Sequence, residues 1–286
     1  MVSTSSAKTL QQKKTLVTGA ASGIGRATAL AAAAEGAELF LTDINEDGLK
    51  ETVELVTGKG GTVRFTKALD ISDFDAVSAF AAEVDDQFGS MDIVMNVAGI
   101  SAWGTVENLE HRHWKSLIDV NLMGPIHVIE NFVPPMIAAG RGGHLVNVSS
   151  AAGLLALPWH AAYSASKFGL RGVSEVLRYD LKRHKIAVHL VVPGGVKTPL
   201  VESVEIAGVD RSDPRIQRYI HAFEKRAITP ERAADAIIEG IKKNRFMVYT
   251  SFDIRFGYWW ARKFAYPYEK AMQAANDRFS TFLPPA

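Results

Sequence analysis

The chain has 286 residues, of which 47% are hydrophobic and 22% charged, a composition typical of a soluble globular protein large enough for a substantial core. Its net charge of +1 and the lack of a dense basic cluster argue against a nucleic-acid partner. It contains no cysteine, which excludes disulfides and thiolate metal sites, and its eight histidines show no spacing that would bind a metal.

Residues 1–12 are polar and lack the apolar core of a signal peptide, so a flexible N-terminus is predicted. No uncharged apolar run approaches the ~20 residues that a membrane span needs. These features favour a cytoplasmic protein.

Short apolar runs then alternate with helix-forming segments up to residue 250. Strands are predicted at 14–18, 37–42, 62–67, 91–95, 143–148, 186–192 and 246–250, and helices at 24–35, 46–57, 73–88, 106–120, 123–139, 161–184 and 230–243. This alternation predicts an α/β fold with a doubly wound, Rossmann-like parallel sheet of about seven strands and helices on both faces. No Pro/Gly/Ser-rich linker interrupts it, so 13–250 is predicted to be one domain.

The first predicted strand leads into a glycine-rich turn, Thr18 to Gly25, and an alanine-rich helix. Glycines let the backbone approach a ligand closely, and a helix N-terminus offers unpaired N–H groups to phosphate. The next apolar run ends in Asp43, about eighteen residues past Gly25, where a carboxylate can accept hydrogen bonds from a dinucleotide ribose. Alternatively, Asp43 caps the helix that starts near Glu46.

Tyr163 and Lys167 lie four residues apart in a predicted helix, so their side chains share one face. A nearby ammonium favours the phenolate and can lower the pKa of a tyrosine by roughly one to three units. The spacing therefore makes a tunable general acid/base. The alternative is an ordinary solvated helix face.

Several motifs follow one another at familiar separations: Thr18-Gly-x-x-x-Gly-Ile-Gly25, Asn96-x-Ala98-Gly99, Asn121, Ser150, Tyr163-x-x-x-Lys167 and Pro193-Gly194. In these the chain resembles a classical short-chain dehydrogenase/reductase from about Lys14 to Tyr249. The resemblance implies that Tyr163 exchanges the proton while hydride moves between cofactor and substrate, and that Lys167 lowers the tyrosine pKa and binds the nicotinamide ribose. It also implies that Ser150, rather than Ser149, hydrogen-bonds the substrate oxygen, and that Asn121 holds a water in a proton relay. Without the resemblance, Ser150 could be a turn or cap residue and Asn121 a helix interruption.

The resemblance further implies which residues contact the cofactor: Gly19, Ser22, Gly23, Ile24, Gly25, Asp43, Asp70, Ile71, Asn96, Ala98, Gly99, Tyr163, Lys167, Pro193, Gly194, Val196 and Thr198. NAD is predicted over NADP because a 2′-phosphate would meet the Asp43 carboxylate, and because Ser22 stands where NADP-using relatives commonly carry a basic residue. The chain departs from the family in having Val97 where a second asparagine is usual.

The substrate pocket is expected to involve Ser150, Tyr163, Trp103 and Leu157, with a lid near 199–228. Its apolar character favours a lipophilic primary or secondary alcohol, or the matching ketone. The predicted function is an NAD-dependent oxidoreductase; the alternatives are an NADP-dependent carbonyl reductase and a dinucleotide-binding regulatory protein without turnover. The resemblance also implies a homodimer or homotetramer.

The C-terminal extension, 251–286, is rich in aromatic residues interspersed with cations. Three interpretations compete. The segment packs on its own or a neighbouring subunit and closes the pocket, it lies on a membrane surface, or it adds to the core.

Overall fold

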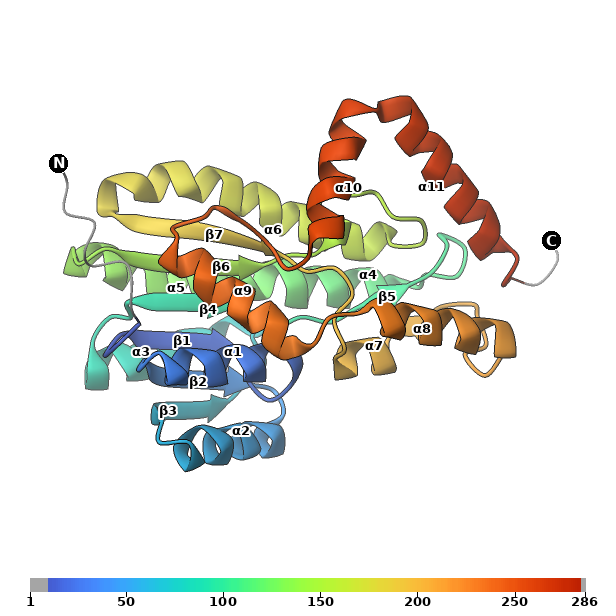
Figure 1. Cartoon of the computed structure of the whole chain (residues 1–286). Helices are drawn as coiled ribbons and strands as arrows, with labels where there is room; N and C mark the ends of the chain where they lie inside the picture. The colour runs from blue at the N-terminus through green and yellow to red at the C-terminus, as the bar shows by residue number, and fades with distance from the viewer. Residues whose placement is uncertain (1–9, 284–286) are drawn as a thin grey trace.

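The computed structural model describes residues 10–283, so most of the predicted flexible N-terminus lies outside the described residues (Figure 1). Its centre is a parallel sheet with the strand order β3-β2-β1-β4-β6-β7-β9. The strands are β1 (Lys14–Thr18), β2 (Glu38–Asp43), β3 (Thr62–Ala68), β4 (Ile93–Asn96), β6 (Gly143–Val148), β7 (Ile186–Val192) and β9 (Met247–Tyr249). The predicted doubly wound sheet is thus confirmed, and each predicted strand is found close to its expected position.

Helices cover both faces of this sheet. One face packs against α1 (Gly23–Ala34), α2 (Glu46–Gly58) and α9 (Pro230–Lys242) in one apolar cluster. The other face packs against α3 (Phe74–Phe88), α5 (Gly124–Ala139) and α6 (Ala161–Asp180) in a second cluster. Because both faces are covered, the central strands are mostly apolar, and β7 is apolar except for the fully buried His189.

Strand β1 lies between β2 and β4, so the chain reverses its winding direction there. In such sheets a crevice opens beyond the carboxyl ends of the strands at this point. The loops after β1, β4, β6 and β7, which carry the motifs found in the sequence, all reach that edge.

The helix predicted at 106–120 begins later than expected. Its first residues form a turn, and α4 (His111–Ile118) starts where the His113 Nδ1 accepts a hydrogen bond from the Glu110 N–H, 2.9 Å away. A π-helical turn, Asp119–Met123, then joins α4 directly to α5. The predicted helix 161–184 ends as α6 at Asp180 and continues as a 3₁₀ turn, Leu181–His184.

The segment predicted as a lid forms two helices, α7 (Pro199–Ser203) and α8 (Pro214–Arg226), which the sequence reading did not foresee. A two-stranded parallel sheet of β5 (Ala102–Trp103) and β8 (Glu205–Ile206) ties this segment to the loop after β4. The lid is therefore anchored to the body of the protein at its middle.

The C-terminal extension consists of α10 (Phe252–Lys263) and α11 (Ala265–Ser280), which form an arch that stands away from the sheet (Figure 1). Neither of these fully described helices contains a buried residue, although Ile254 and Tyr258 of α10 pack against the buried Leu190 and Val192 of β7. Within residues 10–283, no helix combines the length and the apolar character that crossing a bilayer requires.

Candidate active site

The turn between β1 and α1 depends on its glycines. Gly19 has a φ of +69°, a conformation that side chains disfavour, and a Cβ there would lie 2.7 Å from the Ala98 Cα. A Cβ on Gly25 would lie 1.9 Å from the Gly19 carbonyl oxygen. The turn is therefore as tight as the sequence predicts and holds the start of α1 against the loop after β4.

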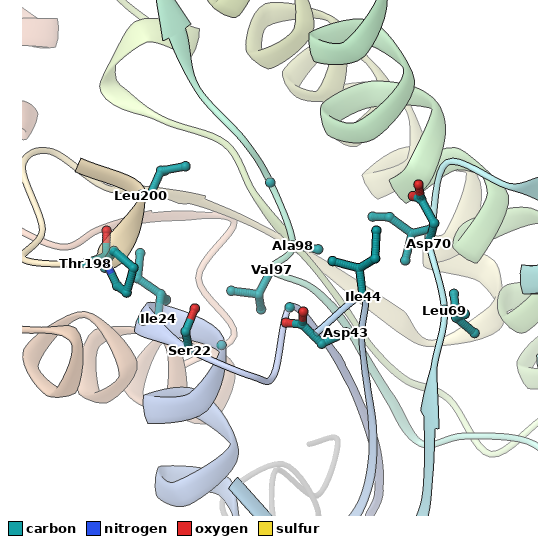
Figure 2. A pocket seen from close by; sticks show the side chains of 16 residues that line it. Ser22, Ile24, Asp43, Ile44, Leu69, Asp70, Val97, Ala98, Thr198 and Leu200 are labelled. Atoms are coloured by element: carbon teal, nitrogen blue, oxygen red, sulfur yellow. The ribbon is translucent and has the colours of Figure 1, made fainter. Parts of the chain in front are cut away.

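A pocket opens at the N-terminus of α1 (Figure 2). It is lined by eleven of the residues predicted to contact the cofactor: Gly19, Ser22, Gly23, Ile24, Gly25, Asp43, Asp70, Ile71, Ala98, Gly99 and Thr198. Ile44, which follows Asp43, also lines it. The N-cap residue, Ser22, makes no side-chain hydrogen bond to the first turn of α1, so the helix keeps backbone donors for an anionic ligand.

Asp43 connects this turn to the end of β2. One carboxylate oxygen accepts a hydrogen bond from the Ala21 N–H and the other from the Asn45 N–H, each at 2.9 Å. Helix α2 is capped by Asn45, which accepts from the Gly48 N–H, so the alternative role of Asp43 as that cap is wrong. The Asp43 oxygens retain free lone pairs that face the pocket.

Arg26, the cation that follows the glycine turn, is not directed at the pocket. The Arg26 guanidinium contacts Glu51 Oε2 at 2.6 Å and the Ala21 carbonyl oxygen at 2.5 Å. Its Nε also donates to the Thr52 hydroxyl. Ile44, an apolar residue that is 72% exposed, lies beside Asp43 in the pocket wall.

Asn96 does not line the cofactor pocket as expected. Its side chain is 1% exposed, and its amide donates to Asn147 Oδ1 at 2.9 Å inside the core. The loop is held instead by Thr18, whose hydroxyl accepts hydrogen bonds from the N–H groups of Val97 and Ala98 at 3.0 and 3.1 Å. Thr18 stands in the glycine motif of the sequence, but its role was not predicted.

A second cavity of about 390 Å³ adjoins the first, because Ile24, Val97, Gly99, Thr198 and Leu200 line both. The predicted residues Trp103, Ser150, Leu157, Tyr163, Lys167, Pro193, Gly194 and Val196 all line this second cavity. The structure therefore brings the tyrosine motif and the glycine turn, far apart in the chain, to the two halves of one crevice.

Tyr163 and Lys167 share the face of α6 that looks into this cavity. The Lys167 Nζ lies 5.9 Å from the Tyr163 ring centroid and donates to the Val148 carbonyl oxygen at 3.1 Å. Burial lowers the pKa of Lys167 to about 8. Burial raises the pKa of Tyr163, and a hydrogen bond with Ser150 opposes that rise. The expected lowering of the tyrosine pKa by Lys167 is therefore not found, since desolvation outweighs the other influences.

The two serines after β6 have different surroundings. The Ser149 hydroxyl is buried and donates to the Lys167 carbonyl oxygen at 3.0 Å. The Ser150 hydroxyl accepts from the Ala152 N–H and hydrogen-bonds Tyr163. Ser150 is thus the one directed toward the tyrosine, as the sequence pattern favours.

Asn121 lies in the π-helical turn and is fully buried. Its side chain pairs with both backbone groups of Ile100, accepting from the N–H at 2.8 Å and donating to the carbonyl at 2.9 Å. Four residues later stands Pro125, which has no N–H to donate to the Asn121 carbonyl. The Asn121 side chain is therefore occupied in fixing the loop after β4, and Pro125 removes the i+4 donor that an α-helix would supply, in keeping with the π-helical turn here.

Comparison with known proteins settles the family. The sequence profile of the short chain dehydrogenase family matches residues 13–207. The chain belongs to this family. It is 36% identical over 271 residues to SadH of Mycobacterium tuberculosis, named as an oxidoreductase, covering 93% of this chain and 96% of that protein.

Two solved structures of short-chain dehydrogenases bear on the cofactor. A dehydrogenase from Burkholderia phymatum in complex with NAD is 28% identical, with a TM-score of 0.81 over 89% of this chain and 94% of that one. A metagenomic short-chain oxidoreductase in complex with NADP is 31% identical, with a TM-score of 0.68 over 85% of this chain and 98% of that one. The protein is therefore an oxidoreductase with a fold that binds a nicotinamide dinucleotide.

The residues of this dehydrogenase fit such a cofactor. A side chain at Gly19 or Gly25 would fill the cradle at the start of α1, and the helix N-terminus is free to meet a pyrophosphate. When bound, a nicotinamide dinucleotide supplies or accepts a hydride. Asp43 lines the pocket at one end of the crevice, and Tyr163 lines the cavity at the other.

The far wall of the dehydrogenase cavity comes from helices that the sequence reading did not assign to it. These residues are Tyr219 and Phe223 of α8, Ile254 of α10, and Met272, Ala275 and Phe279 of α11. The Phe279 ring packs against Tyr219 and Trp159, with centroids 5.3 and 5.6 Å apart. In the sequence, the apolar residues spaced three and four apart in 272–279 indicate that this helix turns one face toward an apolar surface. The arch therefore closes the pocket of its own subunit, the first of the three interpretations.

Proposed function

We propose that the protein is an NAD-dependent oxidoreductase that interconverts a lipophilic primary or secondary alcohol and its carbonyl compound. The observation that carries this proposal is the position of the Ser150 and Tyr163 hydroxyls. Both line an apolar cavity of about 390 Å³ that joins the dinucleotide pocket. A cavity of this size, with few polar groups at one end, suits a mainly apolar small molecule.

Tyr163 acts as the general acid/base. With the substrate oxygen between the two hydroxyls, Ser150 donates a hydrogen bond as negative charge develops there, and Tyr163 gives or takes the proton. Because burial raises the pKa of Tyr163, its phenol is protonated at neutral pH and ready to donate. Carbonyl reduction is therefore favoured at neutral pH, and alcohol oxidation gains as the pH rises.

Lys167 and Asn121 position this pair. Lys167 is held by the Val148 carbonyl oxygen beside the Tyr163 ring, where its ammonium group would bind the nicotinamide ribose. Asn121 fixes the Ile100 loop that borders the cavity, and it would hold the water through which protons return to Lys167.

The preference for NAD follows from the ribose end of the pocket. A 2′-phosphate there would meet the Asp43 carboxylate and the apolar Ile44, while Arg26 is held by Glu51 and the Ala21 carbonyl. An NADP-dependent carbonyl reductase, the alternative, would need a cation in that place.

The test is a panel of lipophilic alcohols offered with NAD while NADH absorbance is followed. We expect turnover with some members of the panel, and the variant Tyr163→Phe should bind NADH normally but lose roughly 10²–10⁴-fold in kcat. Tyr219→Phe, which alters another hydroxyl of the cavity wall, serves as the matched control and should keep most of the rate. A Tyr163→Phe variant with most of its rate would refute the assignment, and NADH binding without turnover of any alcohol or ketone would favour the regulatory alternative.

A further inference from the structure

The outer face of α10 carries aromatic side chains that touch one another in a row. Phe252, Phe256, Trp259 and Phe264 are 78, 50, 50 and 46% exposed. Their successive ring centroids lie 6.2, 5.7 and 6.0 Å apart. Soluble proteins rarely leave a continuous aromatic surface of this kind uncovered, so this aromatic row marks a contact surface.

Three exposed cations accompany the aromatic row: Arg255, Arg262 and Lys263. None of them forms an ion pair with another residue in the described part of the chain. The acid on the same helix is Asp253, at its opposite end from Arg262 and Lys263. The surface thus combines aromatic rings with Arg262 and Lys263 at one end of α10, while Asp253 lies near Arg255 at the other.

The position of this surface also matters. Helix α10 leads away from the sheet, and the chain turns back into α11 at Phe264, so the end of the aromatic row lies at the apex of the arch (Figure 1). Tyr266, 68% exposed, follows directly after this turn. The apex is therefore free to meet a flat surface without interference from the rest of the subunit.

We propose that the arch of α10 and α11 docks on an anionic lipid surface. Aromatic side chains beside Arg and Lys are suited to the boundary between headgroups and acyl chains, where the rings are partly buried and the cations meet phosphates. Each cation near an anionic surface adds about fivefold to the affinity.

A second copy of the chain is the competing occupant of this surface. In a two-fold contact of antiparallel α10 helices, Asp253 of one copy would lie near Arg262 and Lys263 of the other, so the charges alone do not exclude a homodimer. We favour the lipid because Arg262 and Lys263 end α10 at the apex of the arch, where a flat anionic surface meets both at once (Figure 1). Sedimentation distinguishes the two occupants.

Docking in this way would bring the substrate cavity close to the bilayer. The inner side of the same arch lines the cavity with Met272 and Phe279, so a lipophilic substrate could pass from the lipid to the site along α11. This last step rests on the proposed function. Binding to vesicles does not, and it is measured without turnover.

The test is flotation of the purified full chain with vesicles of phosphatidylcholine alone and of phosphatidylcholine with one part in three of phosphatidylglycerol. We expect binding to the anionic vesicles, with a blue shift of tryptophan fluorescence. The double variant Arg262→Glu/Lys263→Glu and the variant Trp259→Ser should each bind at least about tenfold more weakly. The matched controls are Lys59→Glu on α2's end and Tyr179→Ala on α6, both exposed and remote from the arch in sequence, and they should bind like the native chain.

NADH binding, measured for every variant, shows that the fold and the dinucleotide pocket are intact. The proposal is overturned if the native chain ignores anionic vesicles, or if it binds both vesicle types equally. It is also overturned if sedimentation shows a dimer that Trp259→Ser dissociates while vesicle binding is absent. A chain that binds anionic vesicles but oxidises no alcohol would leave the docking surface standing and refute only the proposed function.

Discussion

The substitution Asp43→Asn tests the origin of cofactor preference most directly. It removes one negative charge from the ribose end of the pocket and keeps the size of the side chain. The amide retains one oxygen, so only one of the two hydrogen bonds from Ala21 and Asn45 can still be accepted.

The magnitude follows from the charges involved. The Asp43 carboxylate is half-buried at a pocket mouth, so its repulsion of a phosphate about 5 Å away amounts to roughly 1.5–3 kcal/mol after solvent screening. Its loss should strengthen NADPH binding by roughly tenfold to a hundredfold. NADH binding should weaken by roughly tenfold, because the ribose loses a charged acceptor.

The assay is the fluorescence of bound NADH and NADPH, which needs no substrate. Asp47→Asn is the matched control, since its side chain is 97% exposed outside the pocket, and it should change neither affinity. The reasoning is refuted if the native chain binds both cofactors equally, or if Asp43→Asn leaves the ratio of the two affinities within about threefold of the native value.

Three further predictions concern stability and specificity. Burial lowers the pKa of Lys167 from its ordinary 10.5 to about 8, so the folded chain binds fewer protons than the unfolded chain between these values and its stability rises with pH across that window. Lys167→Met should therefore raise the free energy of unfolding at pH ~7 by roughly 1–3 kcal/mol, seen as a higher melting temperature, while it abolishes turnover. A native protein whose melting temperature does not rise between pH ~7 and ~10 would contradict this. Gly25→Ala should abolish dinucleotide binding because its Cβ would lie 1.9 Å from the Gly19 carbonyl oxygen, whereas Gly172→Ala, with no atom within 4 Å, should bind normally and melt slightly higher. Phe279→Ala should open the end of the cavity and shift kcat/KM toward longer alcohols by roughly tenfold, unlike Tyr266→Ala at the exposed apex; an unaltered preference would show that α11 does not limit substrate length.

The sheet and the cofactor half of the site were predictable because local patterns determine them. The strand at 186–192 is apolar except for His189, and Gly19 and Gly25 are needed where the backbone allows no side chain. The spacing of Tyr163 and Lys167 fixes their common face on α6, whatever the rest of the fold does.

Other features depend on contacts between distant segments, which no local pattern reveals. Asn96 looks like a pocket residue in its motif, yet a partner fifty-one positions away, Asn147, draws its amide into the core. The pKa of Tyr163 depends on how completely the lid and arch exclude water, so the charge of Lys167 alone could not predict its direction. The helices of the extension were missed because their aromatic residues serve two sides, with Ile254 and Tyr258 packing inward and Phe252 and Phe256 pointing out.

The arch is attached to the rest of the subunit by a small number of contacts, such as the Tyr268 hydroxyl accepting from the Ala156 N–H at 2.9 Å and the Arg215 guanidinium donating to the Thr281 carbonyl at 3.0 Å. Segments with so little burial open at a much lower free energy than the central strands do. A bulky molecule can therefore enter, and its product leave, when the arch of α10 and α11 detaches briefly. The dinucleotide would stay bound at the ends of the sheet strands meanwhile. Under the proposed function, exchange of substrate and product would then depend on the arch, and retention of the cofactor on the sheet and its loops.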